Sequence, residues 1–205
     1  MKKISFLILL SIITFSCKKN AKETKNDETT NTEIEQFVVK PEATSVTWTA
    51  YKTTAKVGVG GEFNTLNFDN KAGASPEEAL NNLSFSIPVS SLFTKDVGRD
   101  SKIKSFFFGA MLNTSLLKGS IKVNNGKYIA SITMNGVTGD LPLEVSITEG
   151  RRVKLTGIMN LEEWDALEAL ETLNKACFDL HKGEDGVSKT WEEVAIEVST
   201  YLRKN

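Results

Sequence analysis

The chain has 205 residues, 40% of them hydrophobic and 25% charged, a composition typical of one globular domain with a tail. The formal net charge of −1 offers no electrostatic footprint for nucleic acid, and no basic stripe interleaved with aromatic residues occurs. We therefore expect no nucleic-acid partner. The sequence also has no CxxC pair and no zinc-finger spacing, so we expect no metal site and no cofactor.

The N-terminal segment has the pattern of a secretory signal. Two lysines precede twelve mostly apolar residues, a run too short to cross a bilayer core, which needs roughly 20 residues. The run ends in Ser16 and Cys17, which resemble a bacterial lipobox, whose cysteine becomes the acylated first residue of the mature protein. We expect residues 1–16 to be the signal peptide and Cys17 to be the lipid attachment site. The alternative is a soluble secreted protein whose signal contains a cysteine.

Residues 17–35 are polar and rich in Lys, Glu, Asn and Thr, so they cannot bury enough apolar surface to offset the entropy of ordering. This composition predicts a flexible tether between the lipid and a folded domain at residues 36–205. Acyl chains add about 0.8 kcal/mol of membrane affinity for each buried methylene group. We expect a lipoprotein anchored on the periplasmic side of a bacterial cell envelope, at the outer membrane. With Cys17 acylated, Cys177 is the one free thiol and no intramolecular disulfide can form.

After the tether, apolar residues recur at every second position. In residues 83–90 (LSFSIPVS) they alternate with serine and proline, as in a half-buried strand, and residues 141–148 (LPLEVSIT) repeat the pattern. Proline on the outward face of both segments indicates bulges or unpaired edges. Asn125-Gly126 separates two further runs of this kind and predicts a hairpin, because a type I′ turn needs positive φ at both positions.

These segments give about eight strands with turn signals between most of them and no alternation of strands with helices. The pattern predicts an all-β fold, either an antiparallel barrel or a sandwich. A barrel is favoured because closure removes exposed strand edges, and a barrel of about eight strands encloses either a packed core or one small ligand.

Two stretches depart from the strand pattern. A short helix is expected near residues 99–108, since Ile103, Phe106, Phe107 and Ala110 fall on one helical face and Gly109 follows as a cap. A longer helix is expected near residues 162–181. Its apolar stripe consists of Trp164, Leu167, Leu170, Leu173, Cys177 and Leu180, and Gly183 ends it.

The first helical stretch contains a motif made of Arg99, Asp100, Ile103, Lys104, Ser105, Phe107 and Phe108. This motif and two strand motifs resemble those of the YceI-like family of periplasmic lipid-binding proteins. Gly136-Val137-Thr138 matches a later strand motif of that family, and residues 45–52 and 57–69 fit its opening hairpin, in which a valine-rich strand leads into Gly61 and Phe63. In two respects the chain departs from the family: Lys102 stands at a usual histidine, and the long helix replaces a short strand-rich segment.

The resemblance implies a lipocalin-like antiparallel barrel that holds a long amphiphile, such as a polyisoprenoid, in its lumen. The short helix would close one end of the barrel, with Phe106 and Phe107 facing inward. Without the resemblance, the inward side chains would be read as a dry core. With it, the expected pocket lining is Trp48, Phe63, Phe68, Phe85, Ile87, Phe106, Phe107, Met134, Leu143 and Val145.

Two polar pairs carry competing interpretations. Arg99 and Asp100 could hold a ligand headgroup, but a local ion pair and a contact at the helix start are favoured. Cys177 and His181 lie four residues apart on one helical face and could form an activated thiol or half a metal site. A structural role is favoured, because Cys177 continues the apolar stripe and the chain has one histidine.

We expect a non-enzymatic envelope lipoprotein that binds, carries or stores a hydrophobic or amphiphilic ligand such as a polyisoprenoid or a fatty acid or amide. One alternative is an interaction or structural module with a filled barrel, and a second is a thiol enzyme that uses Cys177. The sequence leaves open whether two copies form a homodimer.

Overall fold

The computed structural model of the chain describes residues 36–204. The expected signal peptide (1–16), the lipid attachment site at Cys17 and the tether (17–35) lie outside the described residues. Within 36–204, no helix combines the length and the apolar character that a transmembrane span requires.

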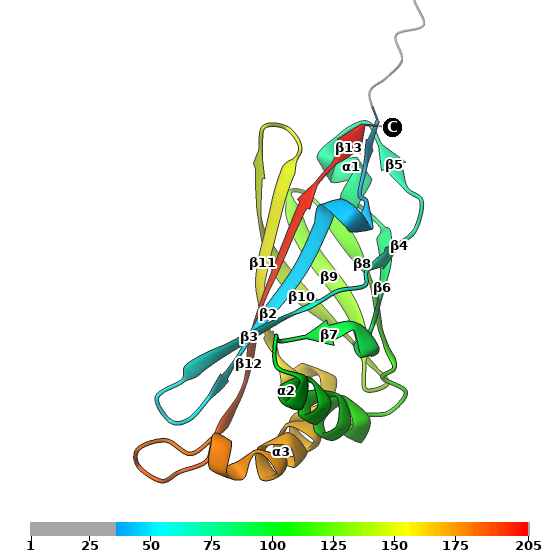
Figure 1. Ribbon diagram of the computed structural model, residues 1–205. Coiled ribbons are helices and arrows are strands. Elements are labelled where there is room, and N and C mark those ends of the chain that lie inside the picture. Colours follow the sequence, from blue (N-terminus) through cyan, green and yellow to red (C-terminus); the bar gives the residue numbers. More distant parts are fainter. Residues whose placement is uncertain (1–35, 205) are drawn as a thin grey trace, which may run out of the picture. The chain divides into compact units, whose positions relative to one another are not determined.

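The main sheet is antiparallel, has ten strands and curls into a half-barrel (Figure 1). Its strand order is β4-β6-β8-β9-β10-β11-β12-β2-β3-β7, so the two edge strands contain only two residues each. This confirms the expected lipocalin-like antiparallel fold. The strands are β2 (Thr44–Lys52), β3 (Val57–Phe63), β4 (Asn67–Phe68), β6 (Leu83–Pro88), β7 (Leu92–Phe93), β8 (Leu116–Asn124), β9 (Lys127–Met134), β10 (Val137–Thr148), β11 (Arg152–Asn160) and β12 (Thr190–Tyr201).

Tight turns connect the long neighbouring strands. Asn125 and Gly126 have φ values of 51° and 73° between β8 and β9, which confirms the hairpin expected from the sequence. Asn135 and Gly136 adopt the same conformation between β9 and β10, at 53° and 73°. Such paired positive φ values match the right-handed twist of the flanking strands, and the turns thereby fix the register of the sheet.

Strand β10 joins the two halves of the curled sheet, one that continues through β9 and one that continues through β11. It pairs with β9 from Val137 to Leu143 and with β11 only from Glu144 onward. Pro142 precedes the start of the pairing with β11, and because proline has no N–H, it cannot donate to a ladder hydrogen bond. The proline that the sequence places on the outward face therefore lies at the seam between the two halves.

A small second sheet and a short helix cover one end of the curled sheet (Figure 1). We call this end the packed end. Val38 and Leu202 lie here and are 2% and 0% exposed. The covering elements are β1 (Phe37–Val38), β5 (Ala72–Gly73), β13 (Arg203–Lys204) and helix α1 (Pro76–Leu80).

Helix α2 (Val97–Lys102) lies at the opposite end and continues into a π-helical turn at Ile103–Phe107. The Asp96 side chain begins α2 by accepting a hydrogen bond from the Arg99 N–H at 3.0 Å. A final helical turn follows at Phe108–Ala110, so the helical course passes through Gly109 rather than ending there.

The π-helical turn corrects one expectation. The Phe108 N–H donates to the carbonyl of Ile103, five residues earlier, so the turn holds one residue more than an α-helical turn. The inward side chains are therefore Phe107 and Phe108, which are 9% and 8% exposed, while Phe106 is 41% exposed. The inward orientation expected for Phe106 is wrong because α-helical spacing does not hold across this turn.

The helical stretch expected near 162–181 is present but divided into three segments. A helical turn at Leu161–Trp164 ends at Asp165, whose left-handed φ of 51° interrupts the helix. Helix α3 (Leu167–Ala176) follows, and a last turn covers Phe178–Leu180. Helices α2 and α3 lie together at this end of the sheet (Figure 1), which we call the helical end.

Candidate functional site

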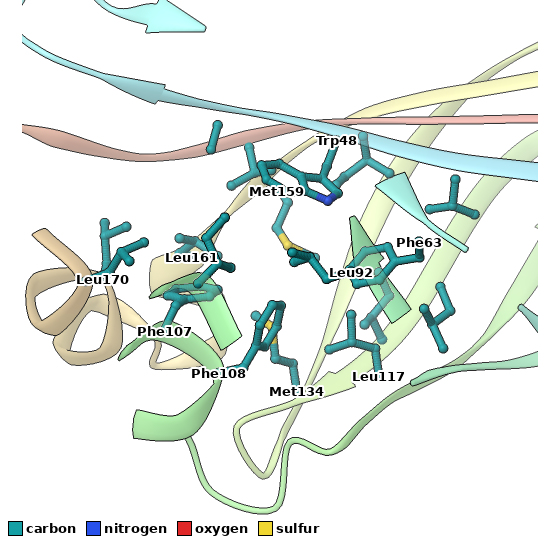
Figure 2. Close-up of a pocket in the computed structure, with 18 of the residues that line it drawn as sticks. Trp48, Phe63, Leu92, Phe107, Phe108, Leu117, Met134, Met159, Leu161 and Leu170 are labelled. Atoms are coloured by element: carbon teal, nitrogen blue, oxygen red, sulfur yellow. The ribbon is translucent and has the colours of Figure 1, made fainter. Parts of the chain in front are cut away.

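A cavity of about 160 Å³ lies inside the curled sheet at the helical end (Figure 2). Residues of β2, β3, β6, β7, β8, β9, β11 and β12 form its wall, and the helical segments cover it. An apolar cavity of about 150 Å³ in a protein core stays dry and admits a molecule the size of benzene. The cavity therefore has room for a ring-sized apolar group or for part of a longer chain.

Six of the ten side chains expected to line a pocket meet in this cavity. They come from four strands and from the π-helical turn, and Figure 2 shows several of them pointing toward one another. The six are Trp48, Phe63, Phe85, Ile87, Phe107 and Met134.

The other four do not line it. Phe106 is turned outward, and Phe68 lies on the two-residue edge strand β4 and packs against the core. Leu143 and Val145 also face inward but lie further along β10, paired with Tyr128 and Leu155 of the packed core. Alternation along a strand identifies the inward face but gives no information about which end of the barrel a residue reaches.

Several lining residues were not expected from the sequence. Phe108 lines the cavity in place of Phe106, and Leu170 and Leu173 project into it from α3. The helical periodicity of Leu170 and Leu173 was visible, but the sequence carried no signal for which part of the sheet that stripe would cover. Other unexpected lining side chains are Leu92, Leu117, Ile132, Met159 and Leu161.

Trp48 is held against the neighbouring strand. Its partner in the register of β2 and β3 is Gly61, and a β-carbon at that position would overlap the indole ring. Glycine at 61 therefore leaves the space that the ring occupies. Because the ring packs onto the backbone of β3, its orientation in the cavity wall is fixed.

A second hollow of about 230 Å³ adjoins the cavity, and we call it the mouth. The two hollows share Trp48, Ala50, Ile103, Leu173 and Thr190, which we call the neck. The apolar interior is thus continuous with the mouth through side chains common to both.

The mouth is rich in basic groups. Lys52, Arg99 and Lys102 line it, together with one carboxylate, Asp96. Asp96 lies 3.7 Å from the Arg99 guanidinium, and the hydrogen bond from the Arg99 N–H, followed by the Arg99 charge, lowers the pKa of this carboxyl. The Lys52 ammonium donates to the carbonyl of Leu180 at 2.9 Å. Positive charge therefore exceeds negative charge among the lining groups.

Arg99 and Asp100 do not act as a pair. Asp100 is buried and accepts hydrogen bonds from the Thr94 N–H and hydroxyl at 2.8 and 2.6 Å, which ties α2 to the segment after β7. The helix-start contact expected in this region is made by Asp96, and Arg99 lies beside that residue in the mouth.

Cys177 and His181 both line the mouth, but their surroundings do not activate a thiol. Burial raises the pKa of the Cys177 thiol, so the thiol stays protonated near neutral pH. Burial, followed by the charges of Lys52 and Lys102, lowers the pKa of His181. The His181 Nδ1 lies 2.7 Å from the Thr190 hydroxyl, so this ring nitrogen already has a hydroxyl partner. Across residues 36–204, no cluster of His, Cys, Asp and Glu could hold a metal ion.

Comparison with known families decides the identity of this fold. The family model for the YceI-like domain matches residues 37–202. The chain belongs to the YceI-like family. A search of curated proteins finds no match.

Two solved structures of low sequence identity share the fold of this YceI-like chain. A polyisoprenoid binding domain from Saccharophagus degradans is 12% identical, with a TM-score of 0.60 over 84% of this chain and 99% of that one. BcnA from Burkholderia cenocepacia is 15% identical, with a TM-score of 0.52 over 80% of this chain and 98% of that one. At these identities the similarity establishes the fold alone.

Proposed function

We propose that this YceI-like protein binds a hydrophobic or amphiphilic small molecule, with its apolar part in the cavity and its polar end at the mouth. The observation that carries the proposal is an apolar cavity at one end of a sheet whose other end is closely packed. The solved relative from Saccharophagus degradans, described as a polyisoprenoid binding domain, supports a ligand of this class.

The size of the cavity limits how such a ligand lies. A ring-sized group fills about 160 Å³, so a polyisoprenoid or a fatty acid or amide must continue through the neck into the mouth. Burial of a methylene group contributes about 0.8 kcal/mol, so ten of them contribute about 8 kcal/mol before association entropy removes several. Contacts of the polar end in the mouth would add to this.

The proposal includes the expected envelope location. Residues 1–16 would act as a signal peptide and Cys17 would carry the lipid, which anchors the protein at the periplasmic side of the outer membrane. There it would carry or store its ligand. Metabolic labelling with an alkyne-tagged fatty acid tests this part: the wild type takes up label, and Cys17→Ser does not. Equal labelling of both would contradict acylation at Cys17.

The alternatives have less support. A module with a filled barrel would need close packing throughout the interior, which is not the state of the helical end. A thiol enzyme would need an activated Cys177, but the pKa of that thiol is raised by burial. Binding without catalysis is the function we propose.

Direct binding tests the proposal. Protein purified from its native envelope should release a hydrophobic molecule on organic extraction, identifiable by mass spectrometry. Delipidated protein should bind the apolar fluorophore N-phenyl-1-naphthylamine. Ala50→Phe places a ring in the neck and should reduce this binding at least about tenfold, since the ring occupies the space of the ligand.

The matched control is Ala195→Phe. Ala195 pairs with Thr49 in the next strand position, so it lies on the opposite face of the sheet from Ala50. This variant should bind the fluorophore as the wild type does. Absence of extracted lipid together with absence of fluorophore binding would contradict the proposed function.

A further inference from the structure

The three tryptophans of the chain differ in how their indole N–H groups are satisfied. The Trp164 Nε1 donates to the carbonyl of Ile132 at 2.9 Å, and the Trp191 Nε1 donates to the carbonyl of Thr53 at 2.8 Å. The Trp48 Nε1 is buried and has no hydrogen-bond partner among the described residues. Because a buried N–H without a partner has lost its hydrogen bonds to water, it carries a free-energy cost that calls for a physical reason.

The surroundings of Trp48 explain why the protein supplies no acceptor. The residue is 9% exposed, and Figure 2 shows its ring nitrogen on the side that faces the cavity, whose lining includes Met159 and Leu92. These neighbours offer hydrocarbon and a thioether, which is at best a weak acceptor. The ring cannot turn toward the backbone, since it packs against Gly61.

Trp48 also lies at the neck, where the apolar cavity meets the basic mouth. A ligand that fills the cavity and continues outward passes this side chain at the point where its apolar part gives way to its polar end. The N–H has almost no accessible surface in this structure, so an oxygen of the ligand reaches this donor when the lining side chains beside it shift to admit the ligand.

We propose that the Trp48 N–H donates a hydrogen bond to an acceptor oxygen of the bound ligand. The site thereby selects an apolar molecule that carries a carbonyl or ether oxygen over the matching hydrocarbon. This inference rests on the proposed function, because it requires a ligand in the cavity. It adds the chemical class of the ligand and the atom that recognises it.

Two probes of matched shape test the inference on the full chain. Acetophenone and α-methylstyrene differ in that a carbonyl oxygen of the first is replaced by a methylene group in the second, and both suit a cavity that admits a benzene-sized molecule. In ¹H–¹⁵N spectra, acetophenone should move the Trp48 indole proton downfield and α-methylstyrene should not. The indole signal of Trp164 serves as the internal control and should keep its position, since that group lies outside the cavity and already donates to Ile132.

Affinities provide the second measurement. Replacing Trp48 with Phe removes the donor and should lower the preference for acetophenone over α-methylstyrene about 2- to 10-fold relative to the wild type. Trp164→Phe is the control, because Trp164 does not line the cavity and its indole N–H donates to Ile132, so this variant should retain the preference. If Trp48→Phe does not fold, the spectra of the wild type decide the question.

The outcomes separate the two proposals. Binding of both probes with no movement of the Trp48 signal, or with an unchanged preference in Trp48→Phe, would overturn the inference and leave the proposed function standing. Binding of neither probe would overturn the proposed function and the inference together. A selective shift of the Trp48 signal by acetophenone supports both.

Discussion

The packed end and the helical end of the same sheet are built from the same alternating strands, yet one is solid and the other hollow. At the packed end, Val38 of β1, Val153 of β11 and Leu202 are at most 2% exposed. At the helical end, side chains from the strands face those of α3 and the π-helical turn across a cavity of about 160 Å³. The difference shows that the covering elements, rather than the strand pattern, decide whether the interior is filled.

The largest effect is expected from truncation at the packed end. Leu202→Ala removes a side chain that is 0% exposed and should lower the free energy of unfolding by about 2–5 kcal/mol, measured by urea denaturation. Met159→Ala at the helical end should cost less, because part of its surroundings is already empty. Equal losses would contradict the distinction between the two ends.

The next effect concerns ligand affinity. Leu170 projects from α3 into the cavity, and Leu170→Ala should weaken fluorophore binding about three- to tenfold, because apolar contacts with the ligand are lost. The control is Leu167→Ala on the same helix, since Leu167 is 42% exposed and does not line the cavity. Isothermal titration of both variants makes the measurement. A loss of affinity in Leu167→Ala as large as in Leu170→Ala would show that α3 acts only through stability.

A smaller effect should separate the mouth from the cavity. Lys102→Gln removes a positive charge from the mouth and should lower the preference for decanoate over decanol about two- to fivefold at low salt. Lys104→Gln is the matched control, because Lys104 lies two residues further along the same helical stretch and lines neither hollow. An equal change in both variants would show that the effect follows net charge rather than the position of the charge in the mouth.

The smallest effect is a dependence of stability on pH through His181. Burial, together with the charges of Lys52 and Lys102, holds the pKa of this imidazole below its ordinary value of 6.5. The unfolded chain therefore takes up a proton more readily than the folded protein, so His181 should lower stability as the pH falls below about 6.5 and have no effect above it. Urea denaturation between pH 5 and 8 should show a shallower decline for His181→Gln. Parallel profiles would contradict this origin, since the chain has one histidine.

Much of the fold followed from local patterns. Alternation in residues 83–90 and 141–148 predicted strands, and Asn125-Gly126 predicted a hairpin, because each depends on the geometry of a few neighbouring residues. The pattern did not predict that Leu143 and Val145 would lie toward the packed end while Met134 reaches the cavity, since height along the barrel depends on strand register and tilt.

The helical segments show the same limit. Spacing predicted a helix near 99–108 and one near 162–181, but the π-helical turn replaced Phe106 with Phe108 in the interior. No residue type marks such a turn in a single sequence. The unsatisfied Trp48 N–H could likewise be found only once the surroundings of the ring were known.

The positions of the first and last strands bear on how a lipid-anchored molecule would present itself. Strand β1 pairs with β13, so Phe37 and Lys204 lie side by side at the packed end, far from α2 and α3 (Figure 1). The proposed tether joins the domain just before Phe37, so it would attach the domain at its packed end. If Cys17 carries the proposed lipid anchor, the mouth would lie at the end of the domain remote from the attachment point, and a ligand could enter or leave while the anchor stays in the bilayer.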